Sequence, residues 1–197
     1  MYGRKEEMRH LMELYNSKTF EFLVMYVRRG VGKTTILKEF AEKTNSLFFP
    51  AREKNDALNL EDFSKVIQYH FDKTFIASFQ TWEDAFRYIG SKAEQRAAVI
   101  IDEFPYIIEE NPSVKSILQH MIDHSWKNKN IFLILCGSSV SIMENDIMGR
   151  KSPLHDRQTS TLEIKPFDYF ESSACFPENR YHQTVLRQSP ILQIKYL

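Results

Sequence analysis

This sequence has little cysteine, no excess of either charge and no long apolar run. Its two cysteines, Cys136 and Cys175, sit in apolar surroundings without a pairing pattern, which favours a reducing cytoplasm over a disulfide framework. Lys+Arg and Asp+Glu are equal at 26 each, so the overall charge gives no evidence for a nucleic-acid or anionic-membrane partner. No apolar run approaches the roughly 18–20 residues of a membrane-spanning helix, and the charged N-terminus has no signal-peptide core. We therefore expect a cytoplasmic protein without a membrane partner.

What the chain does contain is an alternation of apolar, strand-like runs and amphipathic, helix-like stretches. The runs that predict strands are residues 20–27, 46–51, 97–102, 131–139 and 160–166. The stretches with apolar residues at helical spacing are 33–43, 58–71, 81–93 and 114–126. The uninterrupted apolar character of 24–27, 99–102 and 131–136 is typical of central strands in a parallel sheet. The pattern predicts an α/β fold with a mainly parallel five-stranded sheet, whose ligands bind beyond the carboxyl ends of the strands.

The end of the chain follows a different pattern. From residue 177 to residue 197 there is no sustained period, and the apolar residues come in unpatterned clusters. We therefore expect residues 1–176 to form one core domain and residues 177–197 to form an irregular tail.

A short glycine-containing loop follows the first predicted strand and opens the first predicted helix. From Gly30 to Thr34 it matches the second half of the phosphate-binding pattern G-x-x-x-x-G-K-[ST]. Unpaired backbone N–H groups at such a helix start attract phosphate, Lys33 would reach the β and γ phosphates, and the Thr34 hydroxyl would bind Mg²⁺. The alternative is a lysine-topped helix after a flexible turn. The residues expected to contact the nucleotide from this loop are Arg29, Gly30, Val31, Gly32, Lys33, Thr34 and Thr35.

The first glycine of the pattern is missing, because the chain has Val27 at that position. A β-branched residue held in the backbone conformation of that glycine would cost about 1–3 kcal/mol, so we expect Val27 to impair the site without erasing it. The alternative is that the strand end shifts to relieve Val27 and leaves the loop nearly intact.

Two acidic residues end the buried run "AAVIIDEF". Asp102 is placed to hold Mg²⁺, and Glu103 is placed to act as the base that polarises the attacking water. The alternative is two solvated carboxylates at a strand end. Together with the glycine loop, the pair predicts a three-layer P-loop NTPase sandwich that binds a nucleotide and Mg²⁺.

Three further features leave alternatives open. Ser138 follows the next buried strand, where its hydroxyl would either sense the γ-phosphate and position water or cap a helix. Arg157 lies before the last predicted strand and would either supply charge to the phosphates or remain a solvated loop residue. His120 and His124 resemble the inverted zinc-protease pattern H-x-x-E-H, but aspartate replaces the glutamate and no downstream acidic ligand stands out, so we assign them no metal role.

With these residues in place, the sequence resembles the archaeal-type P-loop ATPases, which belong to the AAA+/STAND group of NTPases. The resemblance extends to about Pro177 through the segments "YGRKEEMRHLMELYNSKTFEFLVMY", "RRGVGKTTILKEF", "WEDAF", "VIIDEFPYI", "CGSSVSIMEND", "SPLHDRQTS" and "IKPFDYF". It implies a contact between Arg4, in an N-terminal G-R-x-x-E box, and the adenine or phosphates. It implies DNA association only by analogy, through parts of those proteins that this chain does not contain.

The departures from the family bear on function. The family has glycine at the position of Val27, and it usually reads L-Y-G-R-R-T where residues 154–159 read L-H-D-R-Q-T. Family members also continue into a helical lid and further domains, so we expect this chain to be an ATPase core truncated from such a protein. The leading hypothesis is a Mg²⁺-dependent ATPase impaired by Val27 and the missing lid. The alternatives are a nucleotide-binding switch or interaction module without useful turnover, with a protein partner or self-association, and a small-molecule kinase, for which we find no acceptor site.

Overall fold

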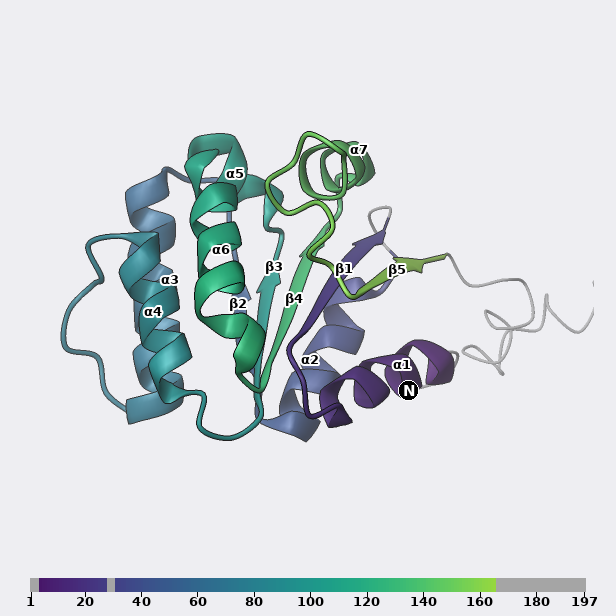
Figure 1. Cartoon of the computed structure of the whole chain (residues 1–197), viewed down its shortest axis with the longest axis horizontal. Coiled ribbons are helices and arrows are strands. Elements are labelled where there is room, and N and C mark those ends of the chain that lie inside the picture. The colour runs from purple at the N-terminus through teal and green to yellow at the C-terminus, as the bar shows by residue number, and fades with distance from the viewer. Residues whose placement is uncertain (1–3, 28–30, 166–197) are drawn as a thin grey trace, which may run out of the picture. The chain divides into compact units, whose positions relative to one another are not determined.

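The uninterrupted apolar runs of the sequence form the middle of one parallel sheet. The computed structural model describes residues 4–27 and 31–165, and in this part of the chain five strands pair in the order β2-β3-β4-β1-β5 (Figure 1). The strands are β1 (Glu21–Val27), β2 (Leu47–Pro50), β3 (Ala97–Asp102), β4 (Ile131–Gly137) and β5 (Ser160–Ile164). All four pairings are parallel, and β4 is buried along its whole length. This confirms the predicted α/β fold, with the three apolar runs in the centre.

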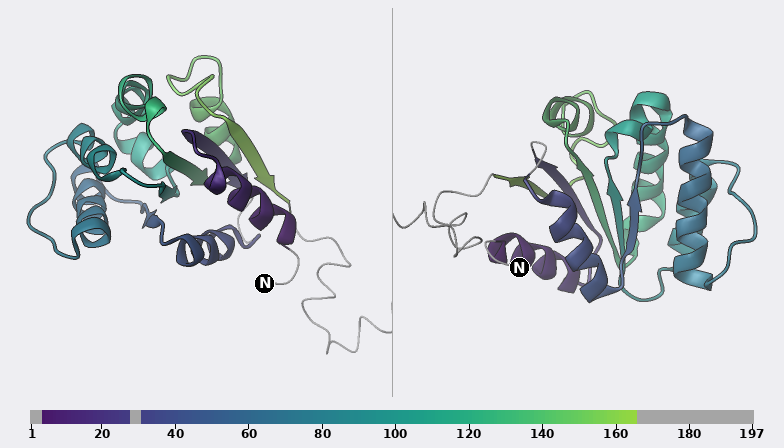
Figure 2. Two further views of the ribbon diagram at one scale, coloured as in Figure 1. Left: turned by 60° about the horizontal axis from the view of Figure 1, so that its bottom comes forward. Right: turned by 180° about the vertical axis from the view of Figure 1, so that it is seen from behind.

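Helices cover both faces of the sheet and make the fold a three-layer sandwich. The α-helices are α1 (Lys5–Asn16), α2 (Lys33–Thr44), α3 (Asp56–Asp72), α4 (Trp82–Lys92), α5 (Pro105–Glu110), α6 (Ser113–His124) and α7 (Val140–Ile142). A 3₁₀-helix, η1 (Trp126–Asn128), follows α6, and a π-helix, η2 (Met143–Ile147), follows α7. Figures 1 and 2 show α1 and α2 on one face of the sheet and α3, α4 and α6 on the other, which agrees with the two hydrophobic cores.

Aromatic side chains fill both cores. On the α2 face, Phe40 makes edge contacts with Tyr15 of α1 and Phe132 of β4, with ring centroids 5.9 and 6.0 Å apart. On the other face, Phe63 of α3 packs against Trp82 of α4 with centroids 5.3 Å apart. Each fully buried side chain of this kind contributes about 1.5–3 kcal/mol, so the two cores hold the strand ends in fixed positions relative to each other.

The turn from β3 into α5 was not predicted from the sequence. α5 begins with Pro105, whose fixed φ suits the first turn of a helix. The end of β4 comes very close to this turn, because a Cβ added at Gly137 would lie 2.7 Å from Pro105 Cγ and 2.8 Å from Met143 Sδ. Only glycine therefore permits this packing of β4 against α5 and η2.

The chain divides into two compact units, Glu6–Lys165 and a second unit of Met1–Lys5 with Pro166–Leu197. The sheet lies in the first unit, and of the second unit only Arg4 and Lys5 are described. The predicted boundary between residues 176 and 177 lies outside the described residues and stays a prediction. Among the helices described, none is long and apolar enough to cross a membrane.

Candidate functional site

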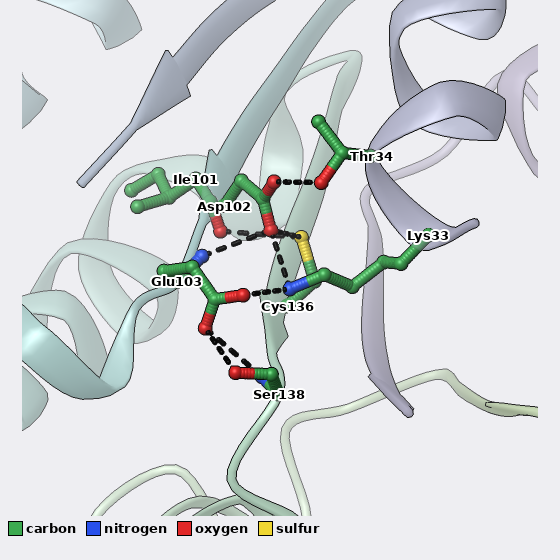
Figure 3. Close-up of polar contacts among 7 residues, drawn as sticks. All are labelled: Lys33, Thr34, Ile101, Asp102, Glu103, Cys136 and Ser138. Carbon is green, nitrogen blue, oxygen red and sulfur yellow. Dashed lines mark hydrogen bonds and ion pairs between the residues drawn. The ribbon is translucent and has the colours of Figure 1, made fainter. Parts of the chain in front are cut away.

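The carboxyl ends of three neighbouring central strands bring the predicted site residues together (Figure 3). Lys33 and Thr34 open α2, which follows β1, while Asp102 ends β3 and Ser138 follows β4. Gly32 precedes α2 with φ of 88°, a left-handed conformation that a side chain would strain although the space around the position is open. Gly32 thus permits the backbone turn that places the first residues of α2 beside Asp102, at the end of β3.

Lys33 is buried between two carboxylates. Its ammonium Nζ lies 2.7 Å from Asp102 Oδ1 and 2.6 Å from Glu103 Oε1, and its side chain is only 5% exposed. Burial lowers the pKa of Lys33, but the negative charge of Asp102 and the hydrogen bonds to the Asp102 and Glu103 carboxylates outweigh it and leave that pKa raised. Lys33 is therefore held in its charged form, as a cation that phosphate oxygens can use.

The Asp102 carboxylate accepts hydrogen bonds on both of its oxygens. Besides the Lys33 ammonium, Oδ1 receives the Glu103 backbone N–H at 3.0 Å and faces the Cys136 thiol with Sγ at 3.4 Å. The other oxygen, Oδ2, receives the Thr34 hydroxyl at 3.2 Å. A hydroxyl and a carboxylate oxygen are the ligand types that Mg²⁺ prefers in phosphate-binding sites, so Thr34 and Asp102 fit this ion.

Glu103 has an unusual backbone conformation, and its side-chain carboxylate accepts from three donors. Its φ is 53°, in the left-handed region that non-glycine residues rarely adopt. Its Oε1 pairs with Lys33, while Oε2 accepts both the backbone N–H and the hydroxyl of Ser138 at 3.0 Å each. Strain of this kind clusters at functional sites, and here it accompanies a carboxylate that lies beside the Lys33 ammonium.

Ser138 has a contact that was not predicted as either a γ-phosphate sensor or a helix cap, because it donates to the Glu103 carboxylate. It is not the residue that precedes α7, which is Ser139, and Ser139 makes no side-chain capping bond. The Ser138 hydroxyl donates instead to Glu103. A direct contact between Ser138 and a γ-phosphate stays a prediction.

Cys136 is a member of the cluster that the sequence analysis missed. Its side chain is fully buried on β4, and Sγ lies 3.4 Å from Asp102 Oδ1 and from the Ile101 carbonyl oxygen. Burial raises the pKa of the Cys136 thiol well above its usual range, and the charge of Asp102 adds to this effect. The strand register brings Cys136 to this place, because β3 and β4 pair up to Ile101 and Leu135, one residue before Asp102 and Cys136.

The structure does not bring Arg157 to this cluster. Thr159 pairs with Phe22 at the start of β1, so the segment before β5 lies at the amino end of the sheet. There the Arg157 guanidinium donates to both carboxylate oxygens of Asp123, with Nη2 2.8 Å from Oδ2. The predicted role of Arg157 at the phosphates is corrected for this reason, since a residue before a parallel strand lies opposite the carboxyl-end site.

Val27 also differs from expectation. It is the last residue of β1, it is 2% exposed in the core, and it is not among the described residues with a positive φ. The backbone of Val27 therefore shows no left-handed strain here, while loop residues 28–30 lie outside the described residues, so the effect of Val27 on phosphate binding stays a prediction.

The nucleotide contacts predicted for the remaining residues of the loop and for Arg4 stay predictions. Arg29 and Gly30 lie outside the described residues. Val31 is half-buried before α2 and Thr35 is exposed on its first turn, and their contacts with a nucleotide stay predictions. Arg4 is buried and belongs to the second unit, so its nucleotide contact also stays a prediction.

The two histidines of α6 lie side by side, with no third metal ligand near them among the described residues. The rings of His120 and His124 have centroids 4.5 Å apart. Within residues 4–27 and 31–165, no group of three or more His, Cys, Asp or Glu side chains is arranged to hold a metal ion.

Comparisons with known proteins are consistent with this site. A family described as an ATPase domain predominantly from Archaea matches residues 1–190. The uncharacterised protein MJECL04 of Methanocaldococcus jannaschii is 33% identical over 182 residues, which are 92% of this chain and 39% of that protein. The uncharacterised protein MJ0424 of the same organism is 33% identical over 89 residues, which are 43% of this chain and 86% of that protein.

Two solved structures share the fold. The Walker-type ATPase paby2304 of Pyrococcus abyssi superposes with a TM-score of 0.67 at 21% identity, covering 96% of this chain and 60% of that one. The ORC2 protein of Aeropyrum pernix, solved as ADPNP–ADP complexes, gives a TM-score of 0.61 at 15% identity, covering 92% of this chain and 52% of that one. At these identities the likeness shows the fold alone. The chain spans about two-fifths of MJECL04 and three-fifths of the Pyrococcus protein.

Proposed function

Because the chain belongs to the family of ATPase domains found predominantly in Archaea, we propose that it binds ATP together with Mg²⁺ and hydrolyses the terminal phosphate. The observation that carries this proposal is the position of the Lys33 ammonium, within 2.7 Å of Asp102 and 2.6 Å of Glu103 at the carboxyl end of the sheet. A lysine, a carboxylate that can hold Mg²⁺ and a second carboxylate that can orient water recur in enzymes that transfer phosphoryl groups, and Lys33, Asp102 and Glu103 fit these roles.

Each residue has a distinct role in the proposal. Thr34 and Asp102 would hold Mg²⁺, which when bound offsets the negative charge of the phosphates. Lys33 binds phosphate oxygens, so those oxygens replace the carboxylates as its partners. Glu103 then has one oxygen, Oε1, free to accept a proton from the attacking water, while Oε2 remains hydrogen-bonded to Ser138.

Turnover of ATP by the purified protein tests the role of Glu103. We expect Glu103→Gln to keep ATP binding and to lower the rate of phosphate release by about 10²- to 10⁴-fold, because the amide cannot accept the proton. Glu109→Gln is the matched control, since Glu109 lies on the neighbouring helix α5 and is exposed. Equal rates in Glu103→Gln and the parent would remove Glu103 from the role of base.

A nucleotide-binding switch without useful turnover is the second candidate. It is favoured by the fact that both oxygens of the Glu103 carboxylate already accept hydrogen bonds, from Lys33 and from Ser138. ATP binding by the parent without measurable phosphate release would support the switch and would contradict hydrolysis.

A further inference from the structure

The fully buried thiol of Cys136 contacts the carboxylate of Asp102, whose other oxygen accepts from Thr34. We propose that Cys136 is a positioning residue for Asp102, donating its S–H to Oδ1 and so keeping Oδ2 directed toward Thr34 and the metal. This inference rests on the proposed function and deepens it, since it identifies a residue that acts on Mg²⁺ binding through Asp102.

Asp102 Oδ1 has three donors, and we expect nucleotide binding to remove one of them and to leave the other two in place. Lys33 must turn toward the phosphates, so its ammonium is not a permanent partner of Oδ1. The Glu103 N–H belongs to the backbone, and the Cys136 thiol projects from the central strand β4, so both remain in place. Cys136 is therefore the one side chain in this set that keeps its contact with Oδ1 when Lys33 leaves.

The position of Cys136 makes its contact hard to replace. The residue is 0% exposed, in a strand that is buried on both faces, so solvent does not reach the thiol. An S–H group is a weak donor, but outer contacts of this kind fix the orientation of a metal-binding carboxylate. A small rotation of Asp102 would move Oδ2 away from the Thr34 hydroxyl, which lies 3.2 Å from it.

Replacement of Cys136 by serine and by alanine tests the proposal, because the two variants have nearly equal volume and differ in the hydroxyl donor. The measurement is ADP binding at increasing Mg²⁺ concentration, with the free energy of unfolding determined for each variant. We expect Cys136→Ser to need the same Mg²⁺ concentration as the parent within about twofold, and Cys136→Ala to need about three- to tenfold more. A merely structural role would lower stability in both variants and leave their Mg²⁺ requirement equal, which would overturn the proposal.

An infrared measurement on the nucleotide-free protein tests the contact independently. Subtracting the spectrum of Cys136→Ala from that of the parent isolates the S–H stretching band of Cys136. In Asp102→Asn, whose amide oxygen is a weaker acceptor, this band should shift toward the frequency of a free thiol. An unchanged band would show that the thiol donates to the Ile101 carbonyl instead, and the proposal would fail.

The two measurements separate this proposal from the proposed function. If the parent binds no ADP at any Mg²⁺ concentration, nucleotide binding is contradicted, and the S–H band alone then decides whether Cys136 donates to Asp102. If ADP binds and the Cys136→Ser and Cys136→Ala variants behave alike, the proposed function stands and the role of Cys136 is contradicted.

Discussion

Glu103 is the residue of the site that joins backbone strain to side-chain hydrogen bonding. It combines a left-handed backbone conformation with an ion pair to Lys33 and two hydrogen bonds from Ser138. Charge-assisted hydrogen bonds of this kind offset the backbone strain, which is of order 1–3 kcal/mol. The hydroxyl of Ser138 is the part of this arrangement that a substitution can remove without disturbing the backbone N–H.

We expect Ser138→Ala to lower the free energy of unfolding of the nucleotide-free protein by about 1–2 kcal/mol, because one hydrogen bond to a charged group is lost. Ser138→Thr, which keeps the hydroxyl, is the control. Urea unfolding of the variants alone and in a Glu103→Ala background forms a double-mutant cycle. If Ser138→Ala costs as much without the Glu103 carboxylate as with it, the hydroxyl does not act on Glu103.

At the scale of elements, the end of β1 differs most from the sequence-based expectation. Valine there would be strained if the loop began at residue 27, but the strand continues through Val27 and buries it with Ile164 of the neighbouring strand β5. The G-x-x-x-x-G-K-[ST] pattern places the start of the loop at residue 27 from sequence spacing. Spacing does not show where strand pairing ends, and here β1 pairs with β5 as far as Val27.

Val27→Gly should therefore destabilise the protein instead of repairing it. Loss of a buried valine and the added backbone freedom of glycine together predict a decrease of about 2–4 kcal/mol in the free energy of unfolding. Thermal unfolding and ATP titration of both proteins measure the effect. Tighter ATP binding by Val27→Gly, without a loss of stability, would restore the strain argument.

The elements that the sequence predicted correctly share a clear physical signal. The central strands are continuous apolar runs, and α2, α3, α4 and α6 have apolar faces at helical spacing, so burial alone identifies them. The carboxyl-end positions of Lys33 and Asp102 follow from parallel pairing. The short helix α5 and the π-helix η2 lack such a signal, because they depend on the close approach of Gly137 to Pro105 and Met143.

Contacts across strands and loops were the least predictable part of the site. Cys136 is indistinguishable in sequence from a core residue until the register of β3 and β4 is known. The phosphate role considered for Arg157 requires the segment before β5 to reach the carboxyl end of the sheet, but the parallel pairing of β5 with β1 puts that segment at the amino end. Strand register depends on pairing between distant segments, so the contact between Cys136 and Asp102 could not be predicted from either segment alone.

At the largest scale, the described part of the unit Glu6–Lys165 is a sandwich with two hydrophobic cores and a polar cluster at the carboxyl end of its sheet. Family membership supports nucleotide binding by this cluster, whereas DNA association, a protein partner and self-association stay predictions. The central claim is that Lys33 binds the phosphates of ATP.

Isothermal titration of ATP with Mg²⁺ into the parent, Lys33→Ala and Lys38→Ala tests that claim most directly. Lys38 lies on the same helix and is exposed, so Lys38→Ala controls for the loss of a positive charge from α2. We predict that the parent and Lys38→Ala bind ATP with equal affinity and that Lys33→Ala binds at least about tenfold more weakly, a difference of about 1.4 kcal/mol. Equal affinity of the parent and of a folded Lys33→Ala variant, or no binding by the parent, would contradict the account.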